Sequence, residues 1–163
     1  MMANNTKNHD KKGWNVNTIN FIQVNVGKRI AATQNLDGTC CKNVVGLVQE
    51  PYLKKNGKAG VAKPSEFLGK GRAAIYAPVM EGIQVLPLPL LSSDDCTVAA
   101  LTCAGCTIWV CSVYLDIKKP VKGSWVKALD AARKASMLVL LGIDSNSHSY
   151  LYGDWENRRG LEM

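Results

Sequence analysis

Apolar and polar residues are arranged along the chain in patterns that predict strands and helices. Residues 19–26 (INFIQVNV) interleave Asn and Gln with apolar residues, which is typical of a β-strand, and residues 30–36 suit a short helix. Residues 43–49 (NVVGLVQ) and 137–143 (MLVLLGI) are almost entirely apolar, as in strands buried on both faces. These patterns predict a strand, a helix and two buried strands.

The middle of the chain carries shorter β-type runs. They are residues 72–77, 83–86, 96–101 and 106–115. The last two runs are joined through Ala104-Gly105, a spacing that predicts a tight hairpin. Cys103 and Cys106 flank this turn as a CxxC motif, and the alternative that they bind structural zinc lacks a second CxxC.

Two further segments complete the pattern. Residues 53–71 contain five lysines and four glycines without a hydrophobic period, which predicts a long surface loop. In residues 123–136, Ser124 is placed to cap a helix, and Leu129 and Ala132 recur on one face of it. The order of elements predicts an α/β domain with helices packed outside its sheets. Residues 1–17 are polar and aperiodic, so we expect a disordered leader before a domain that spans residues 18–163.

The composition narrows the class of protein. The chain has 163 residues, 47% of them hydrophobic, which is enough for one domain with a core. Its net charge of +7 favours polyanionic partners such as nucleic acid or anionic lipid, although a basic surface also serves solubility. No apolar run has the length of a membrane span, and residues 1–14 lack the apolar core of a signal peptide. We therefore expect an intracellular protein whose six cysteines are reduced thiols.

Polar side chains stand at the ends of the predicted strands, where α/β sheets usually hold ligands. Asn25 lies in the first strand, Glu50 ends the second, and Asp144 and Asn146 end the last. Carboxylate and carboxamide oxygens suit Mg²⁺ rather than zinc. The alternative is that each residue only terminates a strand or forms a turn.

Five short motifs, in order, resemble those of a known superfamily. They are Val24-Asn25, Gln49-Glu50-Pro51, Ser112-Val113-Tyr114, Gly142-Ile143-Asp144-Ser145-Asn146 and Asn157-Arg158-Arg159-Gly160. In this order they look like the motifs of the endonuclease/exonuclease/phosphatase superfamily, in particular the apurinic-type endonuclease domains of non-LTR retrotransposons. The resemblance implies a DNase I-like layered α/β-sandwich, with two sheets packed together and helices outside.

The resemblance also implies a role for each matching residue. Glu50 would bind a catalytic Mg²⁺, with Mn²⁺ as the alternative ion, and Asn25 would lie near it. Asp144 would orient or deprotonate the attacking water, and Asn146 would help to position the scissile phosphate. Tyr114 would contact the same phosphate through its hydroxyl, unless it is a core aromatic on a strand.

The chain also departs from the superfamily's pattern. Ile143 separates Gly142 from Asp144, and Ser145 stands where an aromatic residue is common. The superfamily's final Ser-Asp-His element does not occur in the sequence. We therefore expect a C-terminally truncated domain that lacks its final strands. His148 stands where the retrotransposon group often has a histidine, and it is either a site residue or an ordinary loop histidine.

The functional hypothesis is a Mg²⁺-dependent endonuclease that nicks target DNA for a non-LTR retrotransposon. As the resemblance implies, it would be fused to a reverse transcriptase region, act in the nucleus and be impaired as a fragment. An abasic-site repair endonuclease or phosphatase of the same superfamily is one alternative. A basic nucleic-acid-binding remnant without catalysis is the other.

Overall fold

The computed structural model describes residues 18–40, 43–55 and 65–146. The described elements are, in chain order, β1 (Asn20–Asn25), α1 (Ile30–Gln34), α2 (Leu36–Thr39), β2 (Val44–Gln49), β3 (Ser65–Leu68), β4 (Ala73–Pro78), β5 (Ile83–Pro87), the 3₁₀ turn η1 (Pro89–Leu91), β6 (Cys96–Cys103), β7 (Cys106–Tyr114), α3 (Ser124–Lys134) and β8 (Val139–Asp144). The predicted strand–helix order is confirmed.

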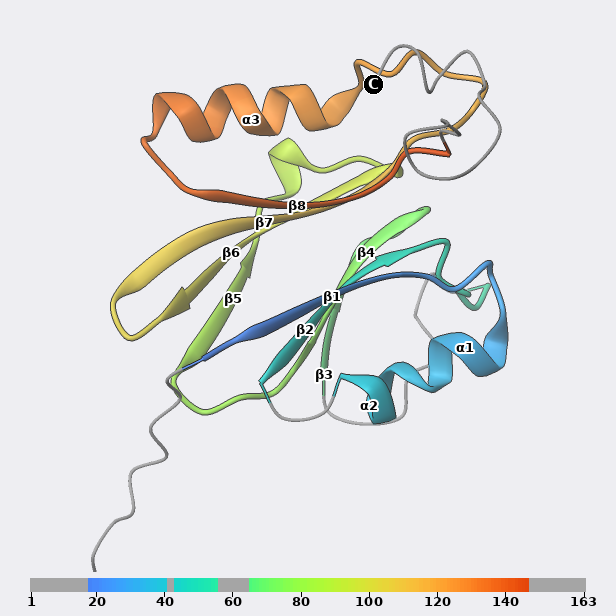
Figure 1. The fold of residues 1–163 in the computed structure, drawn as a ribbon, viewed down its shortest axis with the longest axis horizontal. Helices are drawn as coiled ribbons and strands as arrows, with labels where there is room; N and C mark the ends of the chain where they lie inside the picture. The colour runs from blue at the N-terminus through green and yellow to red at the C-terminus, as the bar shows by residue number, and fades with distance from the viewer. Residues whose placement is uncertain (1–17, 41–42, 56–64, 147–163) are drawn as a thin grey trace, which may run out of the picture.

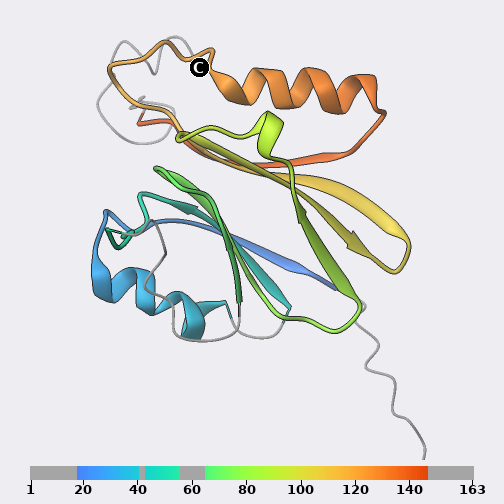
Figure 2. The same ribbon diagram turned by 180° about the vertical axis from the view of Figure 1, so that it is seen from behind.

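The strands form two four-stranded sheets in the orders β1-β2-β4-β3 and β5-β6-β7-β8. The pairs β1/β2 and β7/β8 are parallel, and the other pairs are antiparallel. Figures 1 and 2 show the sheets stacked, with α1 and α2 outside the first sheet and α3 outside the second. This arrangement is the predicted α/β-sandwich with helices outside.

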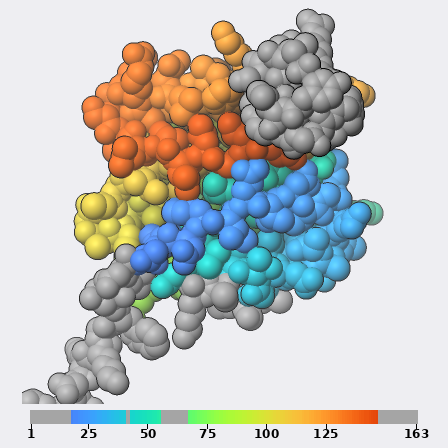
Figure 3. Space-filling view, in the orientation of Figure 1, coloured from blue at the N-terminus to red at the C-terminus, as the bar shows by residue number. Residues whose placement is uncertain are grey.

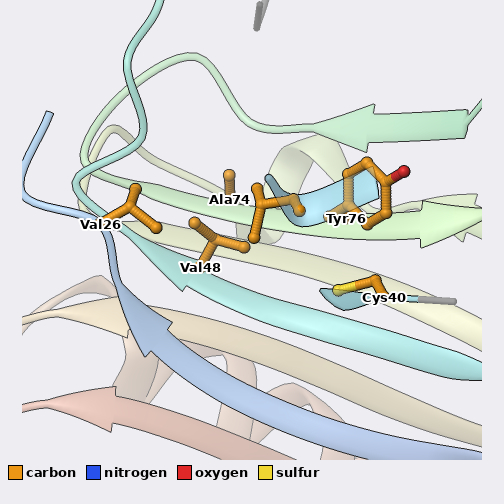
Figure 4. Close-up of a cluster of buried hydrophobic side chains, with 6 residues drawn as sticks. Val26, Cys40, Val48, Ala74 and Tyr76 are labelled. Carbon is orange, nitrogen blue, oxygen red and sulfur yellow. The ribbon is translucent and has the colours of Figure 1, made fainter. Parts of the chain in front are cut away.

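Three clusters of buried apolar residues fill the spaces between these layers. Because successive side chains of a strand point to opposite faces, β2 directs Val45 and Leu47 between the sheets and Val48 towards α1 and α2. Figure 4 shows Val48 beside Val26 and Ala74 in this outer cluster, which also contains Cys40 and Tyr76. The third cluster joins β6 and β7 to α3 and consists of Cys96, Val98, Cys111, Val113, Leu115 and Ala128.

A buried polar bridge connects the two sheets. The Nε2 group of Gln49 donates to Ser112 Oγ at 3.1 Å and to the Gly142 carbonyl at 3.2 Å. Ser112 Oγ donates in turn to the Val48 carbonyl at 2.9 Å. A Cβ atom on Gly142 would lie 2.7 Å from Leu47 Cδ1, so only glycine allows β8 to lie this close to β2. The bridge therefore fixes β2 against β7 and β8.

The structure corrects three details of the sequence analysis. Residues 65–68 form β3, paired with β4, although they belong to the segment predicted as a surface loop. Gly123 is the N-cap of α3, and Ser124 is its first helical residue, with its hydroxyl hydrogen-bonded to Ser93 Oγ at 2.7 Å. β8 is covered on both faces, but it is only half-buried because it is an edge strand within the described part of the chain.

The hairpin between β6 and β7 and the free thiols of the described cysteines agree with the predictions from the sequence. β6 and β7 meet at Ala104-Gly105, both with positive φ, and Cys103 pairs with Cys106 across the turn. The described cysteines are free thiols. Within residues 18–40, 43–55 and 65–146, no helix is long and apolar enough to cross a membrane.

We expect the polar bridge to contribute strongly to stability. Ser112→Ala removes the hydroxyl that donates to the Val48 carbonyl and leaves Gln49 Nε2 with only its bond to the Gly142 carbonyl. The free energy of unfolding should therefore fall by about 1–3 kcal/mol in urea denaturation. Thr107→Val is the matched control, because it removes a hydroxyl from an exposed position of β7 and should change stability by less than about 0.5 kcal/mol. Equal losses of stability in Ser112→Ala and Thr107→Val would show that the bridge does not contribute more than an exposed hydroxyl.

Candidate active site

The carboxyl ends of two parallel strand pairs meet at one end of the sandwich. Asn25 pairs with Gln49 at the end of β1 and β2, and Tyr114 pairs with Asp144 at the end of β7 and β8. In Figure 1 these strand ends lie together on the right. Figure 3 shows β1, in blue, running directly beneath β8, in orange-red, and Gln23 Nε2 donates across this boundary to the Ile143 carbonyl at 2.8 Å.

Asn25 joins the two carboxylates of the candidate site. Its Nδ2 group donates to Asp144 Oδ2 at 2.5 Å and to Glu50 Oε2 at 3.3 Å. Its Oδ1 atom accepts the Gly27 N–H at 2.8 Å, which orients the amide with its donors towards the carboxylates. Asn25 and Asp144 are 119 positions apart in the sequence. The structure thus brings together three residues that sequence analysis predicted separately.

The backbone of Glu50 is held in an uncommon conformation just after β2. Its φ is 50°, in the left-handed region that side chains other than glycine rarely adopt. Its N–H donates to the Arg72 carbonyl at 2.7 Å, and its carbonyl accepts the Lys28 N–H at 2.6 Å. Lys28 Nζ also lies 3.7 Å from Glu50 Oε1. Such strain, on the order of 1–3 kcal/mol, persists where surrounding contacts enforce it, often at functional sites.

Asp144 and Asn146 form a turn directly after β8. Asp144 Oδ1 accepts the Asn146 N–H at 3.2 Å, and Asn146 has a positive φ of 49°. The Asn146 Nδ2 group donates to the Leu115 carbonyl at 2.9 Å, which ties the turn to the end of β7. The Asp-x-Asn spacing therefore places both side chains beside the ends of β7 and β8.

Tyr114 lies at this end of β7 and is half-buried rather than a core aromatic. Burial raises the pKa of its hydroxyl, and the negative charges of Glu50 and Asp144 add to that effect. A hydrogen bond with the Asn146 side chain and the charge of Arg72 act in the opposite direction, but the net pKa is raised. A tyrosine hydroxyl is protonated at neutral pH even at its ordinary pKa of about 10, so the phenol, close to both carboxylates, is available as a hydrogen-bond donor.

Comparison with known proteins identifies the fold. No protein-family model and no curated protein sequence matches the chain. Among solved structures, the chain is similar to the endonuclease domain of TRAS1, a telomere-specific non-LTR retrotransposon, with a TM-score of 0.68 and 18% sequence identity. The match covers 88% of this chain and 67% of that one. The chain has the fold of a retrotransposon endonuclease domain. The predicted DNase I-like sandwich is therefore confirmed.

Glu50 and Asp144 place two carboxylates at this end of the sandwich. Both side chains accept hydrogen bonds from the same Asn25 amide. Across the described residues, no group of three or more His, Cys, Asp or Glu side chains is placed to hold a metal ion. A small oxygen-only set suits Mg²⁺, which keeps several waters and binds through one or two carboxylates together with substrate phosphates. The donor chemistry therefore fits the predicted ion.

A cluster of charged side chains lies beside Tyr114. The sequence analysis did not connect this cluster with the site. Arg72 donates from Nε and Nη2 to the two carboxylate oxygens of Asp95, at 2.8 and 2.9 Å, and from Nη1 to Asp116 Oδ2 at 2.7 Å. Lys119 Nζ also donates to Asp95 Oδ2, at 2.6 Å. The sequence contained one sign of this cluster. Arg72 is a charged residue directly before β4, whose first residues are fully buried.

Some predicted features lie outside the described residues. They are the leader 1–17, His148 and the Asn157-Arg158-Arg159-Gly160 motif. Their predicted roles stay predictions.

The ion cluster should make stability depend on pH. Burial alone would raise the pKa of Asp95, but hydrogen bonds and charge from Arg72 and Lys119 outweigh it and lower the pKa below 3.8. A carboxylate with a lowered pKa stabilises the folded state above pH 3.8, and this contribution is lost as pH falls through the folded-state pKa. The urea midpoint of the wild type should therefore fall more steeply below about pH 4 than that of Asp95→Asn.

Asp95→Asn should also start from a lower midpoint at neutral pH, because it weakens both ion pairs. The control is Asp130→Asn on an exposed position of α3, which should keep the wild-type slope. An unchanged slope in Asp95→Asn would contradict this assignment.

Proposed function

We propose that the chain is a Mg²⁺-dependent phosphodiesterase that nicks DNA, the endonuclease part of a non-LTR retrotransposon product. The observation that carries this proposal is the Asn25 amide that joins the Glu50 and Asp144 carboxylates where the parallel strands end. The endonuclease-type fold supports it independently, because the motif residues come together in a fold shared with a retrotransposon endonuclease.

Glu50 would hold the divalent ion, with Asn25 near it, and Mn²⁺ is the alternative to Mg²⁺. The ion would supply neutralisation of charge on the scissile phosphate. Asn25 keeps the two carboxylates close to one another in spite of their like charge, because one amide group donates to both. In this arrangement Asn25 acts as a neighbour of the metal-binding oxygens, since its own Oδ1 is used by Gly27.

Asp144 is the residue that we assign to the attacking water. Its Oδ2 atom accepts from Asn25 and its Oδ1 atom accepts from the Asn146 backbone, so the carboxylate is held in one orientation. A carboxylate oxygen has more than one lone pair, and each can still accept a proton or a hydrogen bond from water. A fixed, water-accessible carboxylate of this kind can act as a general base.

Tyr114 and Asn146 would hold the phosphate. The phenol of Tyr114 is protonated at neutral pH and its pKa is raised further, so it can donate to a phosphate oxygen. The hydrogen bond between the Tyr114 and Asn146 side chains presents the two polar groups together. Hydrogen bonds that strengthen as negative charge develops lower the barrier to phosphodiester cleavage.

DNA is the partner that this site suits. The chain carries a net charge of +7, and the side chain of Lys28 is 62% exposed beside Glu50, where its ammonium can reach a phosphate. Fusion to a reverse transcriptase region and a nuclear location belong to the same proposal, because a retrotransposon endonuclease would nick chromosomal DNA to start reverse transcription.

A supercoiled-plasmid nicking assay with Mg²⁺ tests the activity. We expect Asp144→Ala to nick about 100-fold or more slowly than the wild type, because general-base catalysis contributes about 10²–10⁴-fold. Asp130→Ala, on the exposed part of α3, is the matched control and should retain wild-type activity. Equal nicking by the wild type and Asp144→Ala would refute the assignment of the site.

The same assay separates the alternatives. A strong preference for an oligonucleotide with one abasic site would favour a repair endonuclease, and release of phosphate from a monoester would favour a phosphatase. Retained DNA binding without nicking by any variant would indicate a nucleic-acid-binding remnant.

Metal binding can be measured without turnover. At ten times its dissociation constant, Mg²⁺ should raise the melting temperature by about 3–6 °C, because a ligand that binds only the folded state stabilises it by RT ln(1 + [L]/Kd). Glu50→Gln should abolish the increase. Glu81→Gln, an exposed glutamate between β4 and β5, is the control and should keep it. A similar increase in Glu50→Gln would place the metal elsewhere.

A further inference from the structure

The Tyr114 ring lies under the guanidinium group of Arg72. The Arg72 Cζ atom is 4.8 Å from the centroid of the ring, which is within the range of a cation–π contact. We infer that Arg72 is a positioning residue that holds Tyr114 in the orientation needed for phosphodiester cleavage. This inference rests on the proposed function, because Tyr114 has its role only if the site cleaves phosphodiesters.

Arg72 is itself rigidly held. Its guanidinium makes a two-pronged contact with Asp95 and a third hydrogen bond to Asp116. A planar group bound on several sides cannot rotate without breaking these bonds, whereas a lysine ammonium has no plane to orient. The side chain of Arg72 is 27% exposed, so this geometry is partly shielded from water. The fixed plane of the Arg72 guanidinium is the support that the neighbouring Tyr114 ring requires.

The backbone of Arg72 is held as well. The N–H groups of Arg72 and Ala73 both donate to the Asp94 carbonyl, at 2.6 and 3.2 Å. A Cβ atom on Gly71 would lie 2.2 Å from the same oxygen, so glycine allows this close approach. The start of β4 is therefore fixed against the turn that precedes β6.

Tyr114 depends on this support because the core does not enclose it. The residue is only half-buried, and it is one of the residues that line a pocket of about 370 Å³ together with Lys119 and Trp125. Its backbone N–H donates to the Asp95 carbonyl at 2.9 Å. Asp95 thus binds the Tyr114 main chain through its carbonyl and the Arg72 side chain through its carboxylate.

Arg72 also connects Tyr114 with the predicted metal ligand. The Arg72 carbonyl accepts the Glu50 N–H at 2.7 Å, so one residue supports the Glu50 backbone and the Tyr114 ring. The bond to Glu50 is made by the backbone of Arg72, so Arg72→Lys leaves it in place and changes only the support of the Tyr114 ring. Reactions of this kind are sensitive to displacements of about 1 Å.

Direct binding of DNA by Arg72 explains the geometry less well. The cluster contains two cations, Arg72 and Lys119, and two carboxylates, Asp95 and Asp116, so these charges balance. Three of the guanidinium N–H groups are already used within the cluster. A neutralised and occupied guanidinium has little attraction left for a phosphate, so its contribution is to orientation.

A double-mutant cycle with Tyr114→Phe tests the inference. Arg72→Lys keeps the positive charge but removes the planar group, and we expect kcat for plasmid nicking to fall about 10-fold with KM changed less than about 2-fold. In the Tyr114→Phe background, where the hydroxyl is already absent, the same substitution should reduce kcat by less than about 2-fold. Arg133→Lys, an exposed arginine at the end of α3, is the matched control and should leave both constants unchanged.

Equal losses in the two backgrounds would overturn the inference, and so would a change in KM rather than kcat. Either result would leave the proposed function intact if the wild type nicks DNA.

A second measurement does not require activity. In protein labelled with 3-fluorotyrosine, the ¹⁹F signal of Tyr114 is identified by its loss in Tyr114→Phe. Arg72→Lys should move that signal towards the position of free fluorotyrosine, while Arg133→Lys should leave it in place. Because the charge is kept, such a shift reports loss of the fixed ring environment. An unmoved signal in folded Arg72→Lys protein, with its fold checked by circular dichroism, would show that Arg72 does not position Tyr114.

Discussion

The buried hydrogen bonds between Gln49, Ser112 and Gly142 hold the two sheets in one register, and the site depends on that register. Each of these residues lies one or two positions before a residue of the site. Gln49 precedes Glu50, Ser112 is two positions before Tyr114, and Gly142 is two positions before Asp144. Apolar packing alone would allow two sheets to slide, because it is not directional. Directional bonds between buried groups therefore align the strand ends at which the candidate site residues lie.

The same alignment brings the polar side chains of Asn25, Glu50 and Asp144 together at the edge of the sandwich. Two carboxylates that approach one another repel, and Asn25 offsets this repulsion by donating to both. Glu50 is held at a positive φ by hydrogen bonds to the backbones of Arg72 and Lys28. Strained backbone and close like charges lower the stability of the metal-free protein. Their presence at one place is understandable if a cation is bound there, as we propose.

Charge has two different uses in this chain. The net charge of +7 and the exposed Lys28 suit a polyanionic partner. The Arg72, Lys119, Asp95 and Asp116 cluster, in contrast, is balanced within itself and lies between strand ends. Counting basic residues in the sequence would assign Arg72 to the first use. Its contacts assign it to the second, because its hydrogen bonds are made to its own protein.

The sequence by itself determined the local structure and the chemical types at the site. Alternation and apolar runs predicted most strands, Ala104-Gly105 predicted the hairpin, and polar residues at strand ends predicted Asn25, Glu50 and Asp144 as candidate site residues. These features depend on residues close together in the chain, so their pattern is visible there. Only the tertiary structure decided the pairing of β3 with β4, the edge position of β8 and the contact of Arg72 with Tyr114. Those outcomes depend on which distant segments pack together, and Asn25 reaches Asp144 across 119 positions because two separate sheets are held face to face.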